Sequence, residues 1–332
     1  MKQITVIASK EFSENLRSVR FKILFVLFIV ILLLAAYQGA QEFQKEMKQY
    51  NEAVKGISEE RYSIRYYEIP KPSILSAFEK LINPGGITII GAIIGIIIGF
   101  DSISGERERG TLKFVLTQPL YRDTLINGKI LGYTILVFTV VLIATILSLG
   151  IIGGLTGIFP DSDETLRIIM FSLTIFIYIM FFTMLGMFFS IIFKQSIDAL
   201  LASIAIFVIL IILISNIAVI VADFVSPIPS YSMFSSSYGK SIQKAWENNW
   251  NVQQNVKYIS PSENFIMINN VVLNPYFEKQ QNNIYSVYGK QVKHSVSESL
   301  SMVWGNFVAI LVGLVILFIA SYVLFMKQDI GN

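Results

Sequence analysis

The stretch ILGYTILVFTVVLIATILSLGIIGGLTGIFP, residues 130–160, contains no Asp, Glu, Lys or Arg. A helix of about 20 apolar residues already crosses the roughly 30 Å hydrocarbon core of a bilayer, so this stretch is long enough to span one. Five further long apolar stretches lack the same four residue types, and they cover residues 23–40, 85–100, 168–193, 199–222 and 300–326. The pattern predicts an all-α integral membrane protein with six transmembrane helices. We expect the second and shortest stretch to continue as helix to Ser104.

Composition agrees with a membrane protein and excludes several other classes. Of the 332 residues, 54% are hydrophobic and 15% are charged, whereas soluble domains are about 25% charged. The absence of cysteine excludes disulfide scaffolds, thiolate nucleophiles and cysteine-ligated metals. His294 is the single histidine, so neither a zinc site nor a Ser-His-Asp enzyme is favoured. We expect no catalytic, metal-binding or cofactor-binding residue in the chain. The net charge of +3 gives no reason to expect a nucleic-acid partner.

The distribution of charge predicts the orientation of the spans, because short cytoplasmic loops accumulate Lys and Arg. With the N-terminus inside, the cytoplasmic pieces carry 12 basic residues in 62 positions and a net charge of +4. The external pieces carry 14 basic residues in 128 positions and a net charge of −1. The cytoplasmic pieces are 1–22, 101–129, 194–198 and 327–332, and the external ones are 41–84, 161–167 and 223–299. We therefore expect both termini to be cytoplasmic.

The first 22 residues are predicted to form an amphipathic helix on the cytoplasmic membrane surface, ahead of the transmembrane domain of residues 23–332. Its apolar residues gather on one side and its basic residues on the other, as in helices that lie among lipid headgroups. The residues assigned to this lipid contact are Lys10, Phe12, Arg17 and Arg20. The alternative is a helix packed on protein.

The segment 101–129 is predicted to be a cytoplasmic coupling loop. Glu106 to Arg109 form a dense run of mixed charge where the second span ends, and Gly110 permits a break. Thr111 can cap a new helical turn, and Pro119 stops it. The apolar face of that turn consists of Leu112, Val115 and Leu116. Such a face needs a cover, and a protein partner is one. The alternative for the charged run is an ordinary solvated helix end.

Three pieces of this segment, ISGERERGTL (103–112), QPLYR (118–122) and GKILG (128–132), resemble a known family. They look like the loop between spans two and three of type-2 ABC transporter permeases, the mainly exporting branch, and of its six-span members with a separate ATPase. The resemblance implies that Glu106, Arg107, Glu108, Gly110, Thr111 and Leu112 couple the permease to that ATPase, with ion pairs around Arg107. It also implies that residues 1–22 form a connecting helix and that the protein lies in the plasma (inner) membrane of a prokaryote.

The chain lacks the phosphate-binding loop that ATP hydrolysis needs. Its two Gly-Lys pairs, at 128–129 and 239–240, have Asp123 and Phe234 where that motif requires a glycine. By the resemblance, ATP and magnesium bind to a partner ATPase, and two permease copies form the export path.

Small residues spaced by four mark two faces for close helix packing. They are Gly91, Gly95 and Gly99 on the second span, and Gly305, Ala309 and Gly313 on the last. Packing within one subunit and a seam between two copies both fit the spacing.

The long external segments, 41–84 and 223–299, leave the function open. The first is predicted to be helix-rich, and the second contains enough apolar residues for a small packed cap, including Trp246, Trp250 and Phe265. A cap can select a substrate or bind an extracytoplasmic partner. The alternative function is therefore a membrane scaffold that transmits ATPase-driven motion to such a partner without solute transport.

Overall fold

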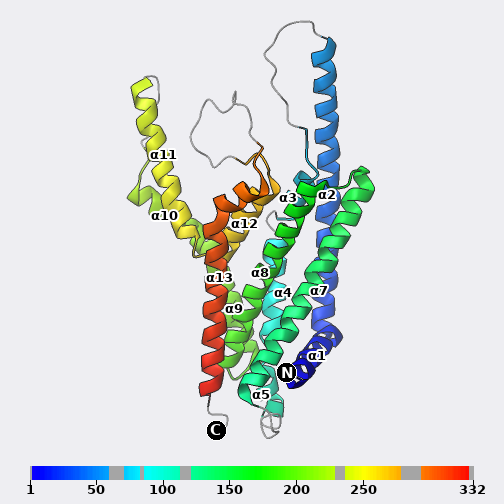
Figure 1. The fold of residues 1–332 in the computed structure, drawn as a ribbon. Coiled ribbons are helices and arrows are strands. Elements are labelled where there is room, and N and C mark those ends of the chain that lie inside the picture. The colour runs from blue at the N-terminus through cyan, green and yellow to red at the C-terminus, as the bar shows by residue number, and fades with distance from the viewer. Residues whose placement is uncertain are drawn as a thin grey trace.

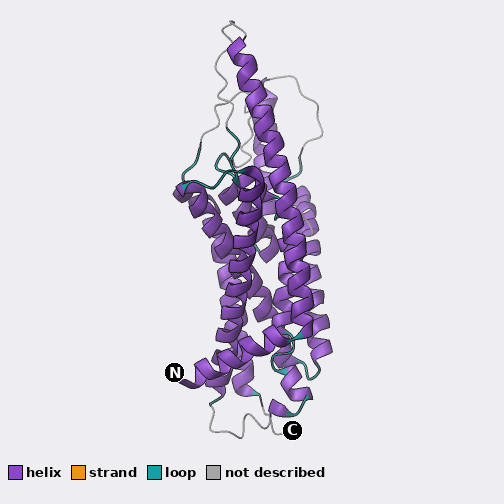
Figure 2. Ribbon diagram, turned by 90° about the vertical axis from the view of Figure 1, so that its right-hand side faces the viewer, coloured by secondary structure: helices purple, strands orange, loops and turns teal. Residues whose placement is uncertain are grey.

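The computed structural model describes residues 2–59, 71–82, 86–112, 121–228, 236–277 and 293–328, which form helices and no strand. The elements are α1 (Lys2–Arg17), α2 (Val19–Glu59), α3 (Leu75–Glu79), α4 (Ile87–Gly99), α5 (Ser104–Glu108), α7 (Arg122–Thr156), α8 (Ser162–Ile192), α9 (Ser196–Val208), the π-helical turn η1 (Ile209–Leu213), α10 (Ile214–Val225), α11 (Ser236–Lys257), α12 (Pro261–Leu273) and α13 (Val296–Lys327). The long helices run side by side along one axis (Figures 1 and 2). Helix α1 lies at the end of the bundle where α13 finishes, and we call this end the α1 end.

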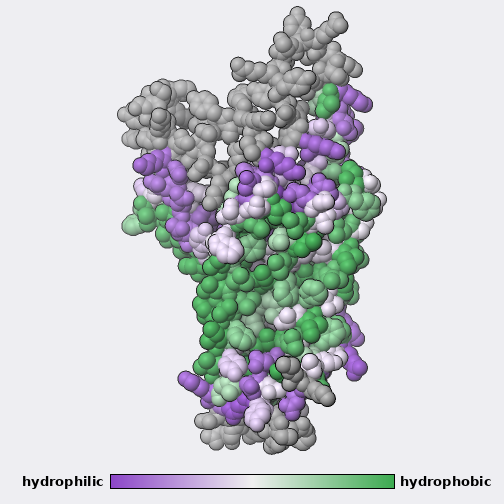
Figure 3. Space-filling view, in the orientation of Figure 1, coloured by the Kyte–Doolittle hydropathy of each residue, from purple (hydrophilic) through white to green (hydrophobic). Residues whose placement is uncertain are grey.

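Six helical segments among the described residues are long and apolar enough to cross a membrane, which confirms the predicted number. They are α2, α4 with α5, α7, α8, α9 to α10, and α13. On the face shown in Figure 3 an apolar belt crosses the middle of the bundle, and polar residues gather toward both ends. The fold is therefore that of a multi-pass membrane protein.

The ends of several helices differ from the prediction because capping residues set them. Helix α7 begins at Arg122 rather than at 130, and it ends where Gly157 takes a left-handed conformation with φ of 69°. Helix α8 begins at Ser162 rather than at 168, because Asp161 and Glu164 form a capping box there. The second span is not one unbroken helix to Ser104, since α4 ends at Gly99 and a turn leads into α5.

The packing of α4 against α8 forms the centre of the bundle. These two spans are 72% and 67% buried over their most apolar windows, whereas α9 to α10 and α13 are only 11% buried. Three glycines allow the close approach. A Cβ on Gly95 would lie 2.5 Å from the carbonyl oxygen of Ile179, and one on Gly99 would overlap the carbonyl oxygen of Thr183. A Cβ on Gly186 of α8 would lie 2.7 Å from the carbonyl oxygen of Ile96.

The contacts of the small-residue faces lie within one chain. Gly91 also faces Ile179 of α8. On α13, Gly305 faces Tyr258, Gly313 faces the ring of Phe181, and Ala309 is half-buried. The five glycines therefore make contacts within the subunit, and a seam between two copies stays a prediction.

Within its described residues, the segment 223–299 does not form a cap separate from the bundle. Helix α12 packs into the bundle against α8 and α13, and the ring of Phe265 stacks on Tyr178 with centroids 4.5 Å apart. Trp246, on the projecting helix α11, remains 53% exposed and Trp250 is half-buried. Arg167 of α8 is fully buried and donates to the carbonyl oxygens of Val272 and His294, which fixes the end of α12 beside the start of α13.

Replacing Gly99 with alanine should disrupt the α4–α8 contact. The added methyl group overlaps backbone, which cannot move as a flexible side chain can, and overpacking of this kind costs about 1–3 kcal/mol. The melting temperature of the detergent-solubilised protein should therefore fall.

Gly150→Ala is the matched control, since a Cβ there meets nothing within 4 Å in the same kind of long helix. This variant should be neutral or slightly more stable, because alanine favours helix over glycine by about 1 kcal/mol. Equal melting temperatures for both variants would contradict the packing explanation.

Candidate functional site

Two glycines of the GKILG motif dock α1 onto α7. A Cβ on Gly128 would lie 2.7 Å from the side chain of Ile7, and one on Gly132 would lie 2.8 Å from both the carbonyl oxygen of Ala8 and Cβ of Glu11. Both helices can therefore approach closely only because these positions lack side chains. The contact buries Ile7 and Ala8 and places Glu11 beside α7.

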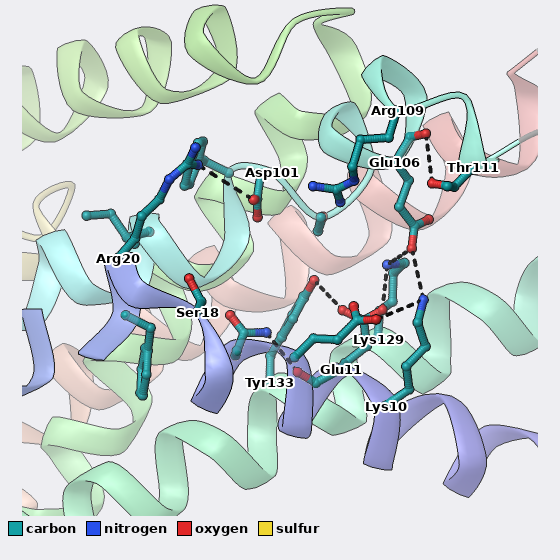
Figure 4. A pocket seen from close by; sticks show the side chains of 16 residues that line it. Lys10, Glu11, Ser18, Arg20, Asp101, Glu106, Arg109, Thr111, Lys129 and Tyr133 are labelled. Carbon is teal, nitrogen blue, oxygen red and sulfur yellow. Dashed lines mark hydrogen bonds and ion pairs between the residues drawn. The ribbon is translucent and has the colours of Figure 1, made fainter. Parts of the chain in front are cut away.

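A buried ion cluster results, which we call the Lys129 cluster and which consists of Glu11, Glu106, Lys129 and Tyr133 (Figure 4). Lys129 Nζ lies 2.7 Å from Glu11 Oε1 and 2.9 Å from Glu106 Oε1, and its side chain is 1% exposed. Tyr133 donates its hydroxyl to Glu11 Oε2 at 3.2 Å. The cluster joins α1, α5 and α7 through charges that are each costly to bury alone.

Both ends of α5 are bound to other helices. Glu108 accepts from the backbone nitrogen of Ser196 at 2.7 Å and from its hydroxyl at 3.0 Å, so it supplies the missing acceptor at the start of α9. Ser190 at the end of α8 accepts from the backbone nitrogens of Ile103 and Ser104, at 2.9 and 3.0 Å. The start of α5 is thereby fixed to α8 as well.

Arg107 binds the ends of two helices. It donates to the carbonyl oxygen of Phe193 at 2.8 Å and, just beyond α13, to Gln328 Oε1 at 2.8 Å. A cation is favourable at a helix C-terminus, where carbonyl groups lack partners. Arg122 completes the contact by donating to the carbonyl oxygen of Gln328 at 2.7 Å. Among the described residues Arg107 itself makes no ion pair and binds neutral oxygens. The ion pairs of this charged run are made by its neighbour Glu106, with Lys129 and Lys10.

The predicted turn after α5 lies only partly within the described residues. Gly110 has φ of 70°, as a break favoured by glycine requires, and Thr111 donates to the carbonyl oxygen of Glu106. Leu112 is buried in the core of the chain itself, so it needs no cover from a partner. Val115 and Leu116 fall outside the described residues. The role of these positions in ATPase coupling stays a prediction.

The N-terminal helix is covered by protein on part of its predicted lipid face. Phe12 is half-buried against the core, and Lys10 lies 3.6 Å from Glu106. Arg17 is exposed, and Arg20, which belongs to α2, lies 4.0 Å from Asp101. The alternative of a helix packed on protein therefore holds for the side that faces α7. Membrane-surface contact by the exposed side stays a prediction.

The Lys129 cluster was missed by sequence reasoning. Lys129 falls at the end of the predicted coupling loop and Glu106 among the predicted coupling residues, whereas no prediction was made for Glu11 or Tyr133. The signal that could have found them was the GKILG motif, since two glycines spaced by four predict a helix contact next to Lys129.

A cavity of about 620 Å³ opens beside this cluster. Its lining side chains come from α1, α2, α4, the turn before α5, α5 and α7, and the sticks in Figure 4 show them converging from several sides. A charged hollow where the spans meet the polar end of the molecule is the candidate functional site.

A family model described as ABC-2 family transporter protein matches residues 5–330, nearly the whole chain. The chain belongs to this family. It is an integral membrane subunit of the permease type, and the resemblance seen in the loop after the second span is confirmed. The match includes α1, α5 and α7, which build the candidate site.

Two curated relatives carry the name "Probable ABC transporter permease protein NosY". The protein from Stutzerimonas stutzeri is 29% identical over 143 residues, which are 43% of this chain and 43% of the relative. The protein from Pseudomonas aeruginosa is 39% identical over 56 residues, 17% of this chain and 20% of the relative. Each match therefore spans less than half of the relative's length.

Replacing Lys129 with methionine should destabilise the protein strongly. Two buried carboxylates would face each other without their shared cation, and removal of one partner from a buried ion pair costs about 3–5 kcal/mol. The triple variant Glu11→Gln, Lys129→Met, Glu106→Gln removes all three charges and should recover much of the lost melting temperature. Lys22→Met is the control, because Lys22 is exposed. A triple variant no more stable than Lys129→Met would contradict this explanation.

Proposed function

We propose that this chain is the permease subunit of an ATP-driven exporter that works as a dimer with two separate ATPase subunits. In this proposal the α1 end faces the cytoplasm, as the excess of basic residues there favours. ATP and magnesium bind to the ATPases, since the chain has no phosphate-binding loop.

The observation that carries the proposal is the set of bonds made by three consecutive residues of α5. Glu106 binds Lys129 of α7, Arg107 binds the ends of α8 and α13, and Glu108 binds the start of α9. Displacement of α5 would therefore be transmitted to four spans at once. Residues 109–112 connect α5 to the rest of the predicted coupling loop, so an ATPase that moved this loop would act on the junction.

Closure of the ATPases is thus expected to move α5 and to alternate access to a path between two permease copies. The contact between copies would use spans that one chain leaves exposed. The span formed by α9, η1 and α10 exposes apolar side chains along its length, including Leu201, Ile212 and Ile220, which lipid or a second copy can cover.

Arg107→Ala should weaken the stimulation of ATPase activity by the permease while leaving the ATPase bound. The substitution frees the ends of α8 and α13 from α5, so motion of α5 would no longer reach them. Coupling free energies of about 1–3 kcal/mol correspond to changes of about 5–150-fold, and permease-stimulated ATPase activity should fall by about fivefold or more. The measurement is stimulated ATPase activity together with co-purification of the ATPase.

Lys194→Ala is the matched control, because Lys194 is exposed next to Phe193, whose carbonyl oxygen accepts from Arg107. The control should stimulate ATPase activity as the unmodified chain does. Undiminished stimulation by Arg107→Ala would overturn the proposed route through α5.

A second candidate function is transmission of force to an extracytoplasmic partner without solute transport. Helix α2 continues as polar helix to Glu59, and α11 projects from the same end of the molecule (Figure 1). ATP-dependent uptake of candidate substrates by inverted vesicles, compared with capture of a partner by residues 223–299 displayed on the intact protein, separates the two. Transport without any partner favours export, and ATP-dependent partner binding without transport favours force transmission.

A further inference from the structure

Two cavities adjoin at the α1 end, one charged and one mostly apolar. The charged cavity described above shares Arg20, Ile97 and Phe100 with a second cavity of about 510 Å³. Apart from Arg20, Glu108 and Ser196, the lining of the second cavity is apolar and comprises Ile23, Leu24, Ile97, Phe100, Ile197 and Leu200. These six residues lie in three segments that are apolar enough to span a membrane, Val19–Lys55, Ile87–Glu108 and Ser196–Val225.

Among the described residues, the first cavity is lined by equal numbers of basic and acidic side chains. The basic side chains are Lys10, Arg20, Arg109 and Lys129, and the acidic ones are Glu11, Glu14, Asp101 and Glu106. A ligand with a net charge would therefore leave some of these groups uncompensated, whereas a zwitterionic ligand would not.

The carboxylate of Glu106 has one oxygen that a hydrogen-bond donor of a ligand could satisfy. Glu106 is 5% exposed, and its Oε2 has no hydrogen-bond partner among the described residues, although Oε1 binds Lys129. A buried carboxylate oxygen without a partner is costly, and an ammonium group would satisfy it.

Two guanidinium groups are available for an anionic group. Arg20 lies over the ring of Phe100 at 6.0 Å and reaches Asp101 only at 4.0 Å. The side chain of Arg109, the residue after α5, lines the first cavity and lies on the other side of Asp101 from Arg20 in Figure 4. Guanidinium groups bind phosphate through paired N–H donors. The cavity thus offers phosphate donors at its rim and an ammonium acceptor at its buried end.

We propose that the two adjoining cavities together bind one zwitterionic phospholipid of the phosphatidylethanolamine class from the leaflet at the α1 end. The phosphate lies between Arg20 and Arg109, the ammonium donates to Glu106 Oε2, and an acyl chain follows Ile97 and Phe100 into the apolar cavity. Because the lipid contacts α1, α2, α5 and α9 together, it fills the space between the N-terminal helix and the coupling region. The proposal does not depend on export or on an ATPase.

Native mass spectrometry of the detergent-purified full chain tests the proposal, with dioleoyl phosphatidylethanolamine, dioleoyl phosphatidylglycerol and soluble phosphoethanolamine as probes. One phosphatidylethanolamine should bind, about tenfold more tightly than phosphatidylglycerol, which corresponds to about 1.4 kcal/mol. The double variant Arg20→Ala, Arg109→Ala should lower this affinity by about tenfold or more. Lys22→Ala with Lys194→Ala removes two exposed cations that do not line either cavity and should leave the affinity unchanged.

Ile197→Trp tests the acyl-chain part separately, because the larger side chain narrows the apolar cavity without changing a charge. It should weaken binding of the lipid and leave any binding of phosphoethanolamine unchanged. Equal affinity for the two lipids, or full binding by the arginine double variant, would overturn the proposal. Phosphoethanolamine binding as tightly as the lipid would also overturn it, in favour of a small soluble ligand.

Discussion

The buried charge of Lys129 constrains the whole α1 end of the molecule. A lysine that is 1% exposed needs acceptors, and Glu11 and Glu106 supply them from two other helices. For the three groups to meet, α1 must lie against Gly128 and Gly132, and α5 must turn back from α4. The ion cluster thereby specifies one arrangement of α1, α5 and α7, because a displaced helix would leave a buried charge without a partner.

Helix α5 extends that constraint to the rest of the bundle. It is only one to two turns long, yet its charged residues hold the ends of α8 and α13 and the start of α9. At the other end, the buried Arg167 plays a comparable part by holding α12 and the start of α13. Between these two polar junctions the bundle is held by close helix contacts, with α4 and α8 at the centre. Polar bonds thus set the order of the helix ends, and small residues set the distance between their axes.

Much of the architecture could be predicted because the bilayer imposes a simple rule on sequence. Charged residues are excluded from about 20-residue helices, so six spans were visible before any contact was known. The helix ends were less visible, since a capping box at Asp161 and a left-handed Gly157 set them through local hydrogen bonds. The candidate site was visible only in part. Glu106 to Glu108 stood out as a charged run, but their partners lie up to 221 residues away.

The sequence by itself determined the number of spans, the helical class and the family, because these depend on local composition and on a contiguous motif. Only the tertiary structure decided that Leu112 is core rather than surface, that Gly95 and Gly99 face α8, and that α12 enters the bundle. It also decided which charges are buried together. The physical reason is that burial and ion pairing depend on which helix faces meet, and the pattern along a single helix does not specify its neighbour.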